Sequence, residues 1–433
     1  MYDTISEKEI AAGRKALMDG WDPKARPNII FIKAKGSKIW DKDGKEYIDC
    51  TSQVFALGVG ACHPKVIKAA GEQLQRITHT AGAFDNIPLL LLSGKIASLA
   101  PGNLNRVNFC LSGGMGVEGA MKIALENRAP ARYFITFEHG YHGRSFATIA
   151  ASFTDPEESY PSYMENIIKL PEAYCYRCGY GLSYPSCKLR CATFIEDTIK
   201  RRVCGGVAGL IMEPVQGNGG QICFPQEFYQ RVREICTRNN VLLIWDEVQT
   251  GFGRVGRMFA SELYGVVPDI LVFGKGAAGG FPLSGFIARD DLKGFETARH
   301  AFTFAHSPVS LAAGLATIEV LQEEKLFERA ERLGRYITER LEKMKEKYPI
   351  IGDIRGPGLA IGIELVKDRE TKEPAIEEAH RVVNLGMERG VMFGMTKYAR
   401  MGNTLKIKPP LVITDDEVEK ALSVFEDCIS QVS

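Results

Sequence analysis

Residues 241–285, VLLIWDEVQTGFGRVGRMFASELYGVVPDILVFGKGAAGGFPLSG, decide how this chain folds. Val241–Trp245 is a continuous apolar run, which predicts a strand buried on both faces of a parallel sheet. Asp246 follows it at the carboxyl end, where open α/β sheets bind ligands. A second apolar run, Ile270–Phe273, ends just before Lys275, which stands between two glycines. The sequence therefore predicts a carboxylate and a lysine at neighbouring strand ends.

A buried carboxylate beside a lysine indicates pyridoxal-phosphate chemistry. Asp246 can keep a pyridinium nitrogen protonated by charge pairing, and Lys275 can form an imine with an aldehyde on the same ring. The structural alternative makes Asp246 the N-cap of a helix and Lys275 a solvated loop lysine.

Composition narrows the classes of protein to consider. The 433 residues exceed one ordinary core and predict two domains. The net charge of +1, without a basic block, gives no reason to expect nucleic acid or an anionic membrane as partner. No apolar run approaches the roughly 18 residues of a membrane span. The first 15 residues are polar and lack the apolar region of a signal peptide, so we expect a cytoplasmic protein.

Strands and helices alternate from about residue 100 to 290, which predicts an α/β fold with a doubly wound, mostly parallel sheet. We assign residues 61–309 to this large domain. Residues 310–433 are expected to form a small α+β domain, and residues 1–60 to pack with it.

Several elements outside the large domain are predicted by local signals. Asp43-Gly44 predicts the turn of a hairpin over Ser37–Asp49. Dense charges predict a long helical stretch over Glu323–Tyr348, and Thr404–Ile407 reads as a strand. Other expected features are a helix start at Ser307-Pro308, a strand over Gly358–Leu365, and a capping box of Thr414 with Glu417.

A glycine-rich turn follows the strand predicted over Asn105–Leu111. Residues 112–119, SGGMGVEG, open a helix whose first N–H groups and dipole make a phosphate site. The dinucleotide-binding pattern G-x-G-x-x-G is also met, by Gly114, Gly116 and Gly119. The alternative is that these glycines serve tight strand-to-helix packing.

Two further strands are predicted to end at chemically useful residues. Phe134–Phe137 leads into a loop with Tyr141 and His142, where an aromatic side chain can stack on a flat cofactor or simply pack. Gly206–Met212 is an apolar run that ends at Glu213.

Residues 174–192 form a separate cysteine-rich insert. The spacing C-x2-C-x8-C-x3-C could accept a tetrahedral zinc, and the ligands would be Cys175, Cys178, Cys187 and Cys191. The eight-residue loop is short against common zinc spacings and no histidine is near, so free thiols or a redox-sensitive pair are the alternatives. We assign no metal ligands to the active site and expect the eleven cysteines to be mostly reduced.

The order of these motifs resembles the class III, or ω-amino-acid, aminotransferases of fold type I pyridoxal-phosphate enzymes. The resemblance extends from residue 40 to residue 414, and the motifs that carry it are SGG (112–114), YHG (141–143), WDEVQTGFGRVG (245–256), GKG (274–276), TFAHSP (303–308) and PPL (409–411). It implies pyridoxal 5'-phosphate as cofactor and a homodimer with shared active sites.

The resemblance also implies a role for each matching residue. Lys275 resembles the Schiff-base lysine, Asp246 the partner of the pyridinium nitrogen, and Gln249 the contact to the phenolic oxygen. The remaining cofactor positions are Gly113 and Gly114 at the phosphate, Val248 and Tyr141 on the two ring faces, His142 in the same loop as Tyr141, Thr303 from the neighbouring subunit, and Glu213, which resembles the acidic residue of a substrate-side arginine switch.

Two departures from the family pattern concern the substrate side and the phosphate cup. The cup lacks the family's hydroxyl and acidic residues, so phosphate binding would depend more on backbone N–H groups. Lys406 replaces the arginine that precedes PPL, and a lysine is a point charge rather than a bidentate clamp. Arg400 is a candidate for the missing fork, and Phe55 for an apolar wall of the substrate pocket.

These features favour transamination between an amine or amino-acid donor and a small 2-oxo acid acceptor. A racemase, an epimerase or a phospho-lyase would use the same cofactor chemistry. A nicotinamide oxidoreductase is a more distant alternative, because it leaves Lys275 and Asp246 without a role.

Overall fold

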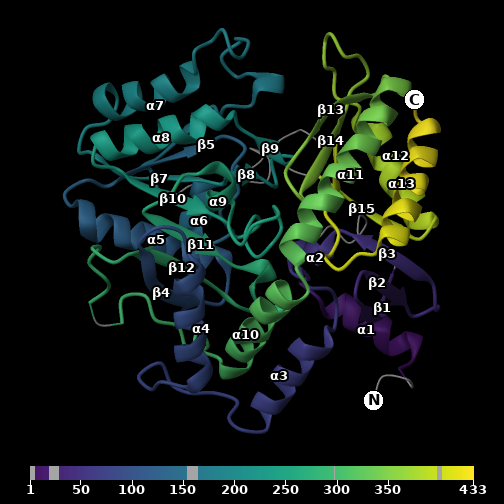
Figure 1. The fold of residues 1–433 in the computed structure, drawn as a ribbon, viewed down its shortest axis with the longest axis horizontal. Helices are drawn as coiled ribbons and strands as arrows, with labels where there is room; N and C mark the ends of the chain where they lie inside the picture. The colour runs from purple at the N-terminus through teal and green to yellow at the C-terminus, as the bar shows by residue number, and fades with distance from the viewer. Residues whose placement is uncertain (1–4, 19–28, 154–163, 297, 397–401) are drawn as a thin grey trace.

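The computed structural model describes residues 5–18, 29–153, 164–296, 298–396 and 402–433. Two seven-stranded sheets form its framework, and they lie in the two halves of the molecule seen in Figure 1. We call them the central sheet and the terminal sheet. In the described part of the chain, no helix has the length and apolar content needed to cross a membrane.

The central sheet confirms the predicted α/β fold. Its strands in spatial order are β4 (Leu104–Cys110), β12 (Ser284–Arg289), β11 (Ile270–Phe273), β10 (Leu242–Asp246), β7 (Val207–Met212), β5 (Tyr133–Phe137) and β6 (Ile167–Leu170). Only β12 runs antiparallel to its neighbours. The sheet is therefore mostly parallel, as the alternation of apolar runs and helices predicted.

Strand β10 is buried on both faces, as its apolar run predicted. Leu242 and Ile244 belong to a core shared with α5 (Gly113–Arg128), whereas Leu243 and Trp245 belong to a core on the opposite face. Alternate side chains of a strand point to opposite faces, so an all-apolar run fits a strand covered on both sides. Helices α7 (Arg190–Arg201) and α8 (Gln226–Arg238) lie together in Figure 1 and cover the second face.

The terminal sheet joins the two ends of the chain. Its strands in spatial order are β1 (Phe31–Lys35), β2 (Lys38–Asp41), β3 (Glu46–Cys50), β15 (Val391–Met395), β16 (Thr404–Ile407), β14 (Ile361–Leu365) and β13 (Ile351–Arg355). Strands β2 and β3 form the predicted hairpin, and Gly44 in its turn has a φ of 84°, which favours glycine. β3 pairs in parallel with β15, which places the segment after β3 next to the end of β16.

The other elements connect and cover the sheets. They are α1 (Glu7–Ala16), α2 (Ser52–Phe55), α3 (Pro64–Leu74), α4 (Ile87–Leu99), α6 (Phe146–Ala151), α9 (Ala260–Tyr264), α10 (Pro308–Glu323), α11 (Leu326–Lys347), α12 (Ile376–Glu388), α13 (Asp415–Ser430), the short strands β8 (Val215–Gln216) and β9 (Ile222–Cys223), and the 3₁₀ turns η1 (Cys175–Arg177) and η2 (Lys275–Ala278).

Some element limits differ from the prediction. The helical stretch expected from Glu323 is wrong at its start, because α10 ends there and Lys325, with a φ of 53°, separates it from α11. Charge density continues through this break, so the sequence pattern did not reveal it. The start of α10 at Pro308 and the capping box of Thr414 with Glu417 are confirmed, although Ser307 makes no side-chain cap bond.

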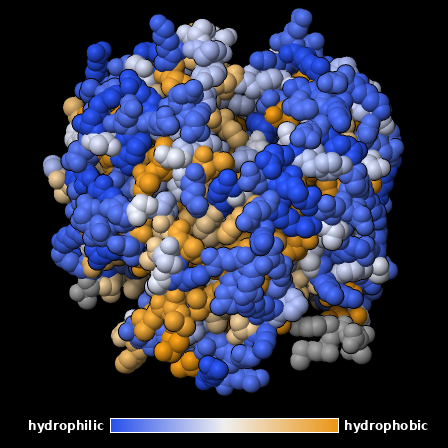
Figure 2. All heavy atoms as spheres, in the orientation of Figure 1, coloured by the Kyte–Doolittle hydropathy of each residue, from blue (hydrophilic) through white to orange (hydrophobic). Residues whose placement is uncertain are grey.

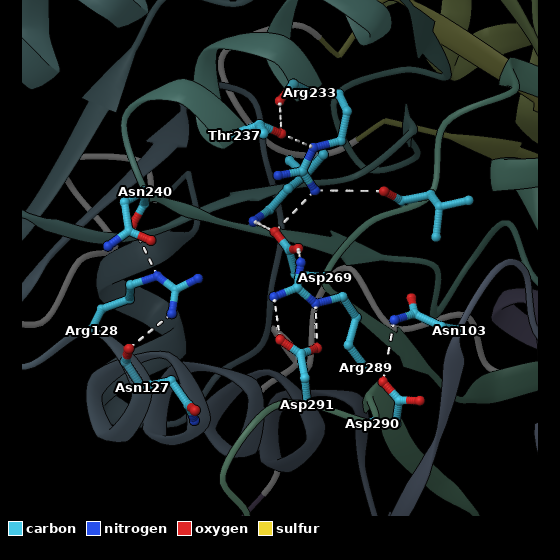
Figure 3. A network of polar contacts seen from close by, with 12 residues as sticks. Asn103, Asn127, Arg128, Arg233, Thr237, Asn240, Asp269, Arg289, Asp290 and Asp291 are labelled. Carbon is cyan, nitrogen blue, oxygen red and sulfur yellow. Dashed lines mark hydrogen bonds and ion pairs between the residues drawn. The ribbon is translucent and has the colours of Figure 1, made fainter.

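A buried carboxylate ties the strands together at the end opposite to Asp246 (Figure 3). Asp269 accepts the backbone N–H of Leu243 at 2.7 Å, Arg233 Nη1 at 2.9 Å and Arg289 Nη1 at 2.8 Å. It thereby links α8, β10, β11 and β12, and the opposite ends of β10 and β11 carry the residues described below.

We expect Asp269→Ala to lower the free energy of unfolding by about 2–4 kcal/mol, because two guanidinium groups and one N–H lose a buried acceptor. Asp291→Ala is the matched control, since its carboxylate pairs with Arg289 but is 60% exposed, and should cost about 0–1 kcal/mol. Urea unfolding measures both values. Equal losses in the two variants would show that Asp269 does not anchor these strand ends.

Candidate active site

Asp246 and Lys275 lie at the same edge of the central sheet. Asp246 is the last residue of β10 and is paired with Val272 in the parallel strand β11, two residues before Gly274. The backbone N–H of Glu247 donates to the carbonyl of Val272 at 2.8 Å, which continues the pairing beyond the strand. Lys275 has a φ of 45°, a strained conformation for a residue other than glycine that is found mostly at functional positions.

The Asp246 carboxylate is held from two sides. His142 Nδ1 lies 2.8 Å from one oxygen, and the Val248 N–H donates to the other at 3.1 Å. His142 Nε2 in turn contacts Thr136 Oγ1 at 3.1 Å, and the histidine is only 2% exposed. The carboxylate therefore has a fixed orientation, and a turn rather than a helix follows it, which removes the helix-cap alternative.

Lys275 is half-buried and forms no hydrogen bond or ion pair with any residue that the structure describes. Burial lowers the pKa of its ammonium group, while the nearby carboxylates of Asp246 and Glu213 act in the opposite direction. A lowered pKa increases the share of neutral amine, the form that can act as a nucleophile and as a base. A half-buried lysine close to two carboxylates does not fit the solvated-loop alternative.

Helix α5 begins directly beside these residues. Ser112 is its N-cap and accepts the N–H of Met115 at 3.4 Å. A Cβ on Gly113 would come within 3.0 Å of both methyl groups of Val248, so the helix start packs closely against the residue after Asp246 and Glu247. Gly114 lies near the hydroxyl oxygens of Ser145 and Thr148, which a Cβ there would approach to 3.8 and 3.4 Å. The sequence analysis missed these two hydroxyl groups because they come from a later loop.

The other two glycines of the dinucleotide-like pattern serve packing. A Cβ on Gly116 would lie 3.0 Å from the carbonyl oxygen of Gly285, and one on Gly119 would lie 2.5 Å from the Phe286 ring. Both contacts are with β12 of the sheet beneath the helix. The packing alternative therefore accounts for Gly116 and Gly119.

The side-chain amide of Gln249 has an unsatisfied oxygen at the sheet edge that carries Asp246 and Lys275. Its Oε1 is buried and has no hydrogen-bond partner among the described residues. A Cβ on Gly217 would lie only 1.9 Å from this oxygen, so a glycine is required there for the amide to keep its position. A buried amide without a partner is expected to bind a polar group of a ligand.

Glu213 links two loops at the sheet edge. Its carboxylate accepts the backbone N–H groups of Tyr141 at 2.8 Å and Gly217 at 3.1 Å. The pKa of Glu213 is raised to about 7, mainly by burial; His142 opposes this shift and Asp246 adds to it. The structure thus places Tyr141, His142 and Glu213 at one end of the sheet with Asp246 and Lys275.

The opposite wall of the site comes from the two chain ends. Phe55 lies in α2, a turn in which Ser52, Gln53, Val54 and Phe55 all have φ between 45° and 69°. Lys275 Nζ is 5.9 Å from the centre of its ring, and Lys408 Nζ is 4.0 Å from it.

The strand β16 supplies Lys406. Burial lowers the pKa of this lysine to about 7; Glu213 opposes the shift, while Lys275 and Arg355 add to it. The structure therefore brings Lys406 to the side of the site that faces Lys275. Arg400 lies outside the described residues. Lys408 was missed by the sequence analysis, although its spacing of two from Lys406 in a strand puts both side chains on one face.

Within one chain, Thr303 does not lie with the residues gathered at the sheet edge. It is exposed, and its neighbour Phe304 is 58% exposed. The sequence analysis expected Thr303 to act in a neighbouring subunit, a role that one chain alone does not reveal.

The four cysteines of the insert line a pocket away from the sheet edge, together with Tyr180, Leu182 and Pro225. Burial raises the pKa of the Cys175 thiol, and raises that of Cys191 to about 12. Among the described residues, no group of three or more His, Cys, Asp or Glu side chains is arranged to hold a metal ion. The arrangement gives the zinc interpretation no support.

Comparison with known proteins identifies the family. The sequence profile described as "Aminotransferase class-III" matches residues 22–429. A leucine/methionine racemase of Thermococcus litoralis is 37% identical, over 93% of this chain and 91% of the racemase. An acetylornithine aminotransferase of Methanothermobacter thermautotrophicus is 35% identical, over 99% and 100% of the two chains. An amine transaminase from an uncultivated Pseudomonas species, solved in its PLP-bound form, aligns with a TM-score of 0.88 at 27% identity, over 96% and 98% of the chains.

Because its pKa is lowered to about 7, Lys406 should make anion binding dependent on pH. The ammonium form is lost as the pH rises through this value, so the affinity for butyrate should fall, by up to about tenfold per pH unit above it. Calorimetric titration from slightly acidic to slightly alkaline pH measures this slope. Lys406→Met should flatten it, and the exposed-lysine control Lys420→Met should not. An unchanged slope in Lys406→Met would contradict the assignment.

Proposed function

We propose that this chain, which belongs to the class III aminotransferase family, is a pyridoxal-phosphate-dependent aminotransferase. It would move an amino group from an ω-amino acid, amine or amino acid to a small 2-oxo acid. The observation that carries this proposal is the position of Lys275, half-buried and unpaired within the described residues, next to a carboxylate that His142 orients.

The residues at the sheet edge fit the cofactor group by group. Asp246 would pair with the ring nitrogen, Lys275 would hold the aldehyde carbon, and the unsatisfied amide of Gln249 would meet the phenolic oxygen. Val248 and Tyr141 would cover the two ring faces. The N–H groups at Gly113 and Gly114 would bind the phosphate at the start of α5, with the helix dipole in support.

When bound, pyridoxal phosphate supplies an electron sink for the negative charge that develops on the amino-bearing carbon of the substrate. The protein has three tasks around it. Lys275 would hold the cofactor until a substrate amine replaces it, and its freed amine would move a proton between the substrate carbon and the cofactor's aldehyde carbon. Asp246, held by His142, keeps the ring nitrogen protonated. A 2-oxo acid would reverse these steps and leave as the new amino acid.

Racemisation is a second candidate function. It is supported by the similar identity of this chain to a racemase and to an aminotransferase, at 37% and 35%. Both reactions begin with the same proton removal by Lys275, and they differ in whether the proton returns to the substrate carbon.

The need for a 2-oxo acid separates the two functions. A screen of ω-amino acids, simple amines and α-amino acids, each with and without pyruvate or 2-oxoglutarate, should give a new oxo product only when the acceptor is present. Chiral chromatography of the α-amino acids follows racemisation in the same samples. Rapid interconversion of enantiomers without any acceptor, and no oxo product, would favour the racemase.

We expect Lys275→Ala to remove the visible absorption of the cofactor bound to lysine and the exchange with amines, since the bond to the cofactor forms on the Lys275 amine. Lys275→Arg is the matched control, because it keeps a positive charge but cannot form the bond, and it should behave in the same way. Borohydride reduction of the wild type followed by peptide mapping should find the cofactor on Lys275. Cofactor found on another lysine would refute the assignment.

We propose further that the protein is a homodimer. Large hydrophobic side chains are exposed near Thr303 and on α4, and Figure 2 shows apolar surface where α4 lies in Figure 1. They are Phe84, Ile87, Leu90, Leu91 and Phe304. An exposed apolar group of this size is typical of an interface, and a second copy would bring Thr303 to a neighbouring phosphate site.

Thr303→Ala should weaken cofactor binding by about 1–2 kcal/mol, the range for a lost hydrogen bond to a charged group. Equilibrium dialysis of the cofactor measures this change, with the exposed Thr371→Ala as control. Sedimentation of the wild type should give a dimer. A fully active monomer would disprove the shared site.

A further inference from the structure

We infer that Lys406 and Lys408 together form an anion site that selects substrates whose acidic end carries two negative charges. The inference rests on the proposed function, because it places the substrate amine at Lys275 and its acidic end at the lysine pair. It names the substrate class, which the family assignment leaves open.

The two lysines lie on the same side of the terminal sheet. Lys406 is in β16, and Lys408 follows one residue after the end of that strand, so their side chains point to the same face. The residues opposite Lys406 in the neighbouring strands are both glycines, Gly362 in β14 and Gly394 in β15. A Cβ on Gly394 would lie 3.1 Å from Lys408 Cε and 3.2 Å from Lys406 Cβ. Both side chains therefore share the space that this glycine leaves open.

Both lysines are buried and have no anionic partner within the described residues. They are 4% and 7% exposed, and neither side chain forms a hydrogen bond or ion pair with a described residue. Lys408 Nζ has only the face of the Phe55 ring, at 4.0 Å. A ring face stabilises an ammonium group less than a paired anion does. The lysine pair is therefore incomplete without an anionic ligand.

The carboxylates nearby are already engaged by other donors. Asp49 accepts from Thr51 and Gln53 at 2.6 to 3.2 Å, and Glu213 accepts two backbone N–H groups.

Another cation nearby adds positive charge. Arg254 donates to the carbonyls of Leu359 and Pro409 and to Ser52 Oγ, so no carboxylate balances it through these bonds. The substrate side therefore holds more positive charge than its own carboxylates balance.

A single carboxylate would pair only one of the two lysines, and the other, whose pKa is lowered by burial, would lose its proton. Two point charges on flexible stems also do not reproduce the planar fork that an arginine offers to one carboxylate. Two negative charges on the acidic end of the substrate would pair both lysines. The matching chemistry is a dianion, either two carboxylates or a phosphate monoester.

The test measures the binding of unreactive anions to the cofactor-loaded protein by calorimetry. Butyrate provides one negative charge, glutarate two on separate carboxylates, and ethyl phosphate two on one group. The variants are Lys408→Met, the charge-preserving Lys408→Arg, and the surface control Lys420→Met. Thermal unfolding of each variant reports whether it folds. These ligands lack an amine, so binding is measured whether or not the protein transfers amino groups.

We expect at least one dianion to bind the wild type about tenfold or more tightly than butyrate, since pairing a second buried charge is worth at least that factor. If glutarate binds more tightly than butyrate, the site takes two carboxylates; if ethyl phosphate does, the site takes a phosphate monoester. Lys408→Met should remove the advantage while changing butyrate affinity less than about twofold, and Lys408→Arg should keep most of it. The inference is overturned if neither dianion exceeds butyrate in the wild type. It is also overturned if folded Lys408→Met keeps the full advantage, or loses all three ligands equally.

Discussion

The fixed orientation of the Asp246 carboxylate is the constraint on which the rest of the site depends. The carboxylate lies at the end of a strand buried on both faces, between His142 at 2.8 Å and the N–H of Val248 at 3.1 Å. Asp269 holds the other end of the strand, so contacts at both ends fix the position of β10. A ligand ring placed against Asp246 would therefore have one position, and Lys275 on the neighbouring strand would meet it.

Much of this arrangement could be predicted from the sequence because it follows from strand ends. Continuous apolar runs predicted β10 and β11, and parallel pairing requires the residues after them to meet at one edge. The contact of His142 with Thr136, and the hydroxyl groups near Gly114, could not be predicted, because they depend on how a separate loop folds back. The break at Lys325 was hidden because charged residues continue through it. The roles of Gly116 and Gly119 stayed open until their contacts with β12 showed what the missing Cβ atoms would meet.

Burial, rather than contact with neighbouring charges, is the main cause of the altered acid–base behaviour in this site. It raises the pKa of Glu213 to about 7 and lowers that of Lys406 to about 7, while the pKa of Lys275 also falls. A lowered pKa increases the share of neutral amine in Lys275, and proton transfer by Lys275 requires that form. The same burial makes the lysines of β16 costly without a ligand, so the features that promote chemistry and those that select substrates have one physical origin.

The most direct test of this account is the ¹⁵N NMR shift of pyridoxal phosphate labelled at the ring nitrogen and bound to the protein. If Asp246 and His142 hold the ring as argued, the nitrogen should show the shift of a protonated pyridinium across the neutral pH range. Asp246→Ala should move it to the shift of a neutral pyridine, because the ring nitrogen then loses its anionic partner. A neutral pyridine signal in the wild type, or the same protonated signal in Asp246→Ala, would contradict the account.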